Sequence, residues 1–148
     1  MDLAEFLTES CVLPAMRAAD KPAAVAEMAA PLAARLGLEC EELVGILMAR
    51  EALGTTAVGN GVAVPHGKVP GLSAPALAVG RNSAGIDFGA ADKEPCRIFF
   101  MILAPEGGAG IHLKLLAQVA RRAKDPEFRA ELLAASGASG MLQVVTAP

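Results

Sequence analysis

The side chain in this sequence best suited to nucleophilic chemistry is His66, which lies between Pro65 and Gly67 directly after a short apolar run. Proline has a fixed φ and biases the preceding residue toward an extended conformation, so the run predicts a strand that ends at the histidine. Gly67 has no Cβ, and we expect it to let another molecule approach the imidazole closely. A neutral imidazole keeps one ring nitrogen with a free lone pair, which is the form that a phosphoryl acceptor needs.

Four further residues are of the types that stabilise a phosphoryl group, whose transfer spreads negative charge over three oxygens. Arg50 offers a planar, permanently charged guanidinium. His112 is expected beside the N-terminus of its own helix, where free N–H groups and a partial positive charge favour a phosphate. Thr55 and Thr56 add hydroxyl donors. Together with His66, these residues predict a phosphoryl-transfer site.

Each of these residues also has an ordinary structural interpretation. A histidine in a turn is most often only a turn residue, Arg50 fits a helix end whose charged head reaches solvent, and His112 fits a helix start. The glycine-rich segment at residues 107–110 lacks Walker or Rossmann spacing, so it is interpreted as a connector. A hydrolase that uses His66 as a general base is disfavoured, because no serine lies in a recognisable nucleophile elbow.

The helices that must position the arginine follow from hydrophobic periodicity. Asp20 is a good N-cap for a first helix, and Gly37 ends its periodic apolar run. A second helix is predicted over residues 41–50. Arg50 follows Leu43 by two helical turns and therefore lies on the same, apolar face of that helix.

The middle of the chain has a different texture, with glycine and proline separating short apolar runs. Strands are predicted over residues 62–64, 76–80, 86–88 and 97–103. The last of these is apolar on both faces and predicts a central strand that is covered on both sides. After a loop at residues 107–110, helices are predicted from about Ile111, after Asp125 and after Ser139. This order predicts an α+β domain with helices on both faces of a mixed sheet.

Length and composition limit the number of domains, the partners and the location that we expect for the protein. Its 148 residues, 53% of them apolar, are expected to form one domain over residues 1–148. A net charge of −3 and the absence of Trp and Tyr make nucleic acid an unexpected partner. No apolar stretch reaches the roughly 20 residues of a membrane span, and the start lacks a signal peptide's basic region, so we predict a cytoplasmic protein without membrane insertion. Three dispersed cysteines and two histidines predict reduced thiols and no metal.

Two segments resemble motifs of enzyme IIA domains of the mannitol/fructose type, from the phosphoenolpyruvate-dependent sugar phosphotransferase system. The first combines Arg-Glu-Ala-Leu-Gly-Thr-Thr at residues 50–56 with paired glycines and Pro-His-Gly at residues 65–67. The second is the predicted helix at residues 111–121. The family often has Ser where this chain has Thr55, and either residue keeps a hydroxyl. The resemblance covers nearly the whole chain and implies a three-layer α/β/α sandwich with a central mixed β-sheet.

The resemblance also implies roles for the candidate residues and identifies the chain as a phosphotransferase component that needs no cofactor. His66 is implied to accept the phosphoryl group through Nε2, His112 to orient or stabilise it, and Arg50 to stabilise its charge. The predicted phosphate-binding residues are Thr55, Thr56 and Gly67. The implied donor is an HPr-type phosphocarrier protein, and the implied acceptor is a IIB domain or a set of regulatory target proteins.

Two branches of the family, and one function from another class, remain open at this level. Gly67-Lys68 after His66 is similar to the nitrogen-regulatory branch, which transports no sugar and reports its phosphorylation state to regulatory targets. The alternative is a free-standing fructose- or mannitol-type enzyme IIA that passes the phosphoryl group to a IIB domain. A third possibility is a protein-binding regulatory module that is never phosphorylated. The joint presence of His66, Arg50 and His112 counts against that module.

Overall fold

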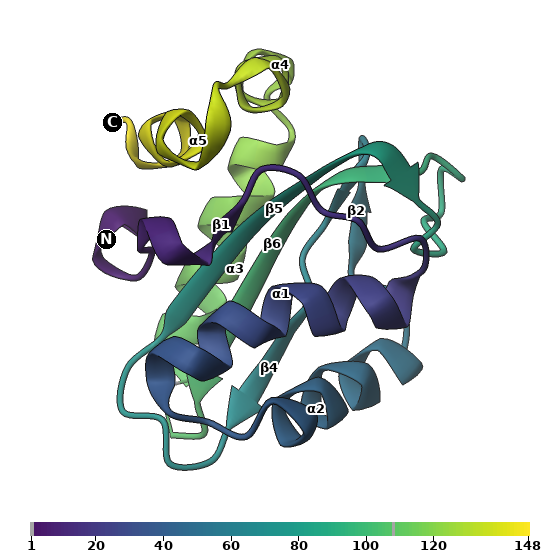
Figure 1. Ribbon diagram of the computed structural model, residues 1–148. Helices are drawn as coiled ribbons and strands as arrows, with labels where there is room; N and C mark the ends of the chain where they lie inside the picture. Colours follow the sequence, from purple (N-terminus) through teal and green to yellow (C-terminus); the bar gives the residue numbers. More distant parts are fainter. Residues whose placement is uncertain (1, 108) are drawn as a thin grey trace.

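The computed structural model describes residues 2–107 and 109–148, which form a sheet enclosed by helices (Figure 1). The six strands are β1 (Val12–Leu13), β2 (Ala57–Gly59), β3 (Val62–Ala63), β4 (His66–Val69), β5 (Ala76–Ile86) and β6 (Cys96–Pro105). Their order is β1-β5-β6-β3-β2, and β4 also pairs with β6. β6 runs antiparallel to β5 and parallel to both β3 and β4, so the sheet is mixed as predicted.

The helices cover both faces of this sheet. They are α1 (Lys21–Leu36), α2 (Cys40–Ala52), α3 (Ala109–Ala123), α4 (Pro126–Ala134) and α5 (Gly137–Thr146), with short 3-10 turns at Leu3–Glu5 and Glu9–Cys11. α1 packs on β5 and α2 on β4, whereas α3 packs on β6 from the opposite face (Figure 1). The three-layer α/β/α sandwich is therefore confirmed. Within the described residues, no helix is both long enough and apolar enough to cross a membrane.

Local sequence signals explain where the first helices begin and end. The side chain of Asp20 accepts a hydrogen bond from the Ala23 N–H, and Gly37 ends α1 with a φ of 67° that favours glycine. The carboxylate of Asp125 caps α4 in the same way. The central strand was also predicted correctly, because residues 98–104 of β6 are buried on both faces of the sheet.

Several predicted boundaries differ from those in the structure, and three of the differences change an element or a loop. β5 continues to Ile86 because its pairing with β6 resumes after an irregularity, so no separate strand covers residues 86–88. α5 begins at Gly137 and not after Ser139. α3 begins at Ala109, which places the end of the predicted 107–110 loop inside the helix; Gly108 lies outside the described residues.

Candidate active site

His66 lies on a strand and not in a turn, which corrects the prediction that the apolar strand ends there. β3 stops at Ala63, and His66 is the first residue of β4, where it pairs with Ile102 of β6. Pro65 has no N–H for a ladder hydrogen bond, but its carbonyl accepts one from the Ile102 N–H at 2.9 Å. The histidine therefore stands on backbone that is fixed by the central strand.

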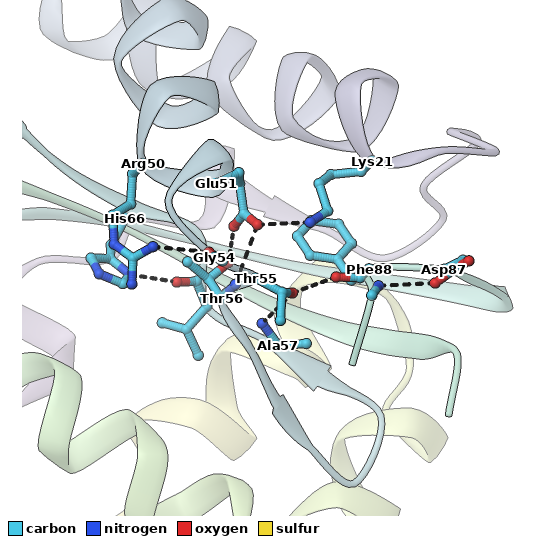
Figure 2. A network of polar contacts seen from close by, with 12 residues as sticks. Lys21, Arg50, Glu51, Gly54, Thr55, Thr56, Ala57, His66, Asp87 and Phe88 are labelled. Carbon is cyan, nitrogen blue, oxygen red and sulfur yellow. Dashed lines mark hydrogen bonds and ion pairs between the residues drawn. The ribbon is translucent and has the colours of Figure 1, made fainter. Parts of the chain in front are cut away.

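A second contact orients the His66 ring. Its Nδ1 lies 2.7 Å from the carbonyl oxygen of Val64 (Figure 2). A carbonyl oxygen only accepts hydrogen bonds, so Nδ1 carries the proton and donates it. In the neutral ring the free lone pair then belongs to Nε2.

The other two principal candidates lie around the same cavity as this ring. The cavity has a volume of about 380 Å³ and is lined by residues of α2, β4 and α3: Ile46, Ala49, Arg50, Leu53, His66, Gly67, Lys68 and His112. Its wall is mostly apolar, and Leu53 at the edge is 84% exposed. The structure thus brings together His66, His112 and Arg50, which are up to 62 positions apart in the sequence.

His112 lies in the first turn of α3 with its ring centroid 5.2 Å from that of His66. The side chain is buried, and among the described residues its Nδ1 has no hydrogen-bond partner. Burial is the main cause that lowers the pKa of His112, and the nearby His66 and Lys68 lower it further. The ring is therefore neutral near pH 7. Because a proton on Nδ1 would be a buried N–H without an acceptor, we expect the proton on Nε2.

Arg50 lies in the last turn of α2, and its guanidinium reaches forward to the turn that follows the helix. Nη1 donates to the carbonyl oxygen of Gly54 at 2.9 Å, which leaves the rest of the planar group for a ligand (Figure 2). Arg50 and His66 also line a second, smaller cavity of about 210 Å³ together with Thr55 and Thr56. Arg50 thus lines both cavities beside the histidine.

The two threonine hydroxyls already donate to protein groups. The Thr55 hydroxyl donates to the carbonyl oxygen of Phe88 and accepts from the Ala57 N–H. Thr56 is buried, and both its hydroxyl and its N–H donate to the carboxylate of Glu51. This arrangement disfavours the predicted phosphate contacts from Thr55 and Thr56, because neither hydroxyl has a proton left to donate.

Gly67 lines the main cavity, but its lack of a side chain has another consequence in the structure. A Cβ added at Gly67 would lie 2.9 Å from Cγ2 of Ile46 on α2. The glycine therefore allows α2 to pack closely against β4, in addition to the predicted access for a ligand.

Sequence analysis missed one residue next to the site, Glu51. Its side chain is 2% exposed and accepts a hydrogen bond from Nζ of Lys21 at 2.9 Å. Lys21 and Glu51 are 30 residues apart. No local pattern relates them, and the one signal in the sequence that could have indicated Glu51 is its place inside the 50–56 motif.

Comparisons with known proteins show the class to which this fold belongs, the enzyme IIA domains. The model of the family described as "Phosphoenolpyruvate-dependent sugar phosphotransferase system, EIIA 2" matches residues 5–147. The chain belongs to this family, which is a component of a phosphotransferase system.

Several relatives carry the name of one branch of the family. The chain is 37% identical to a nitrogen regulatory protein of Bradyrhizobium diazoefficiens over 148 residues, which is 100% of this chain and 97% of the relative. It is 40% identical to a fructose-specific EIIA component of Haloferax volcanii over 89 residues, 60% of this chain and 58% of the relative. The solved nitrogen regulatory protein IIA-Ntr of Neisseria meningitidis has a TM-score of 0.92 at 30% identity, with 97% of this chain and 99% of that chain covered. Mannitol IIA of Escherichia coli shares the fold, with a TM-score of 0.76 at 21% identity over 93% and 97% of the two chains.

Proposed function

We propose that this protein is a histidine phosphocarrier that accepts a phosphoryl group on Nε2 of His66. The observation that carries this proposal is the hydrogen bond from His66 Nδ1 to the Val64 carbonyl, which leaves the lone pair on Nε2. The same cavity holds the two other groups that such a transfer needs, His112 and the guanidinium of Arg50.

The reaction needs positioning and charge stabilisation more than covalent assistance. The donor is a phosphohistidine on an HPr-type protein. The bond between its phosphorus and its ring nitrogen breaks and leaves the electron pair on that nitrogen, while the Nε2 lone pair of His66 forms the new bond to phosphorus. No proton has to move. Arg50 offsets the charge on the phosphoryl oxygens, and His112 donates a hydrogen bond from Nε2 to one of them.

We assign the protein to the nitrogen-regulatory branch, where the phosphorylation state controls binding to regulatory target proteins. This assignment is supported by the full-length similarity to the nitrogen regulatory protein of Bradyrhizobium diazoefficiens and by the higher TM-score for IIA-Ntr than for mannitol IIA. The second candidate is a sugar-specific enzyme IIA that passes the phosphoryl group to a IIB domain. The 40% identity to the fructose-specific component of Haloferax volcanii favours that alternative over part of the chain.

Intact-mass spectrometry tests the proposal directly. The protein is mixed with phosphoenolpyruvate, enzyme I and HPr, and in parallel with the nitrogen-branch donor pair. We expect wild type to gain one acid-labile phosphoryl group and His66→Ala to gain none, with circular dichroism showing that the variant is folded. The donor pair that transfers faster indicates the branch.

Failure of folded wild type to gain mass from either donor pair would refute the phosphocarrier proposal. It would favour a protein-binding module that keeps the shape of the site without its chemistry. A phosphoryl group that also appears on His66→Ala would place the acceptor elsewhere, and His112 would be the next residue to replace.

A further inference from the structure

A buried carboxylate lies directly behind the proposed site. Glu51 is 7% exposed and occupies the last turn of α2, next to Arg50. Three hydrogen bonds reach its carboxylate: one from Nζ of Lys21 at 2.9 Å, one from the Thr56 N–H at 3.2 Å, and one from the Thr56 hydroxyl (Figure 2). A carboxylate buried to this extent is tolerated only when it is paired and hydrogen-bonded, and here both conditions are met.

Lys21 is held in place on its other side. Its Nζ lies 4.8 Å from the ring centroid of Phe88, a fully buried residue whose carbonyl oxygen accepts the hydroxyl of Thr55. The start of α1, the end of α2 and Phe88 therefore meet beside Glu51. The carboxylate joins the first two directly, and Phe88 contacts them through Lys21 and Thr55.

Hydrogen bonds continue from this carboxylate to the acceptor histidine. Thr56 donates to Glu51, and the carbonyl oxygen of Thr56 accepts from the Val64 N–H at 3.0 Å. The carbonyl oxygen of Val64 in turn accepts from Nδ1 of His66 at 2.7 Å. The carbonyl that orients the acceptor ring thus belongs to Val64. Val64 is hydrogen-bonded to Thr56, and Thr56 is hydrogen-bonded to Glu51.

The same carboxylate also fixes the backbone beside the arginine. Thr56 binds Glu51 across the turn that ends α2, and the carbonyl oxygen of Gly54 in that turn accepts from Arg50 Nη1. Through Thr56, Glu51 is therefore connected to both parts of the chain that carry the site: the turn that orients Arg50 and the segment that orients His66.

We propose that Glu51, whose charge is offset by Lys21, is a positioning residue for phosphoryl transfer. It sets the orientation of His66 through Thr56 and Val64. It sets the orientation of Arg50 through the turn after α2. This inference rests on the proposed function and extends it to residues that do not touch the phosphoryl group. Because Glu51 is buried and does not line the cavity, it affects the rate of transfer within the complex and not the affinity for the phosphoryl donor.

The decisive comparison is between two glutamates on helices. Glu51→Gln keeps the shape of the side chain, but an amide has only one oxygen for three hydrogen-bond donors and points its NH₂ at the others. Glu27→Gln is the matched control, because Glu27 accepts backbone N–H groups of Arg17 and Ala18 and lines neither cavity beside His66. We expect Glu51→Gln to lower the maximal transfer rate about tenfold or more at an unchanged donor KM. Glu27→Gln should transfer at the wild-type rate.

A second pair of variants separates the hydrogen bond from packing. Thr56→Val keeps the size of the side chain and removes the hydroxyl that donates to Glu51. Thr56→Ser keeps the hydroxyl and removes a methyl group. The proposal expects Thr56→Ser to transfer faster than Thr56→Val, whereas a purely structural role of the buried methyl expects the reverse order.

Nitrogen-15 NMR of the histidine rings provides a readout that does not need phosphorylation. In wild type we expect the His66 ring to be protonated on Nδ1, and in Glu51→Gln we expect a shift toward protonation on Nε2, because the Val64 carbonyl is held less firmly. If the ring signals of Glu51→Gln match those of wild type, the positioning role is refuted, whether or not wild type accepts a phosphoryl group. If wild type is phosphorylated and Glu51→Gln transfers as fast as Glu27→Gln, the proposed function stands and this inference fails.

Discussion

Replacement of Gly67 by alanine tests how closely the strand that carries His66 packs against the helix that carries Arg50. Gly67 lies in β4, where its φ is one that any residue adopts, so backbone strain does not enter. An added Cβ would come within 2.9 Å of Ile46 Cγ2 and 3.7 Å of Leu47 Cδ2, both on α2. Real Cβ atoms essentially never approach another atom to 2.9 Å, and the branched side chain of Ile46 has little rotamer freedom on a helix. α2 must therefore move away from β4.

The expected cost follows from two opposing effects. Overpacking a well-filled contact costs about 1–3 kcal/mol. Replacing a glycine by alanine lowers the conformational entropy of the unfolded chain and so raises the free energy of unfolding by about 0.4–1 kcal/mol. We therefore expect Gly67→Ala to lower the free energy of unfolding by about 1–2 kcal/mol, which moves the urea midpoint down by about 0.5–1 M for a typical slope of about 2 kcal/mol per M. Because α2 carries Arg50, phosphoryl transfer should slow in the same variant.

A glycine-to-alanine substitution on α2 itself serves as the control. Gly45 is exposed within the helix, and a Cβ added there meets nothing within 4 Å. Gly45→Ala should raise the free energy of unfolding by about 0.5–1 kcal/mol, the opposite sign. Ile46→Ala removes the Cγ2 methyl, so Gly67→Ala should cost little or nothing in that background. Equal costs of Gly67→Ala in both backgrounds would refute the packing argument.

Three further predictions concern single groups. Burial lowers the pKa of His112 below its ordinary value of 6.5, so the His112 ring binds a proton more readily in the unfolded chain than in the folded protein. The free energy of unfolding should therefore decrease as the pH falls below about 6.5. Urea midpoints measured between about pH 5 and 8 should show this decrease in wild type and a smaller one in His112→Gln. Arg50→Lys keeps the charge but loses the planar fork, and we expect phosphoryl transfer to slow about tenfold in a rapid-quench assay; an unchanged rate would reassign Arg50 to a structural role. Burial raises the pKa of Cys96 to about 11 and Cys11 is also buried, so a thiol reagent should modify only the half-buried Cys40 in the native protein and all three thiols after unfolding.

Features that depend on neighbouring residues could be predicted from the sequence. The N-cap Asp20 and the C-terminal Gly37 place α1 correctly because capping uses groups within one turn of the helix. The apolar run of β6 identifies the central strand because burial on both faces leaves no room for polar alternation. The family resemblance of the Pro-His-Gly and 50–56 motifs led us to expect His66 and Arg50 in one site, and in the structure both residues line one cavity.

Features that depend on distant partners could not be predicted. β4 contains glycine and lysine, which are poor strand formers, and it exists because β6 lies beside it. The prediction for the hydroxyls of Thr55 and Thr56 took account only of their chemistry. The partner of Thr55 is Phe88, 33 residues away, and no local pattern relates the two. Thr56 is five residues from its partner Glu51, but their contact depends on the turn that ends α2 and on the burial of the carboxylate, which the spacing did not indicate.

The site is divided between a sheet and a helix, and this division explains why the contacts behind it matter. The backbone of His66 is fixed by β6, whereas the position of Arg50 depends on the last turn of α2. No contact between neighbouring residues therefore fixes the two side chains relative to each other. Two separate sets of contacts fix their relative position. One is the close packing of Ile46 on Gly67. The other is the set of hydrogen bonds that joins Glu51 to the His66 segment through Thr56. Phosphoryl transfer relies on orientation far more than on covalent assistance. We therefore expect a small displacement of α2 to slow the proposed phosphoryl transfer even when every residue proposed to touch the phosphoryl group is retained.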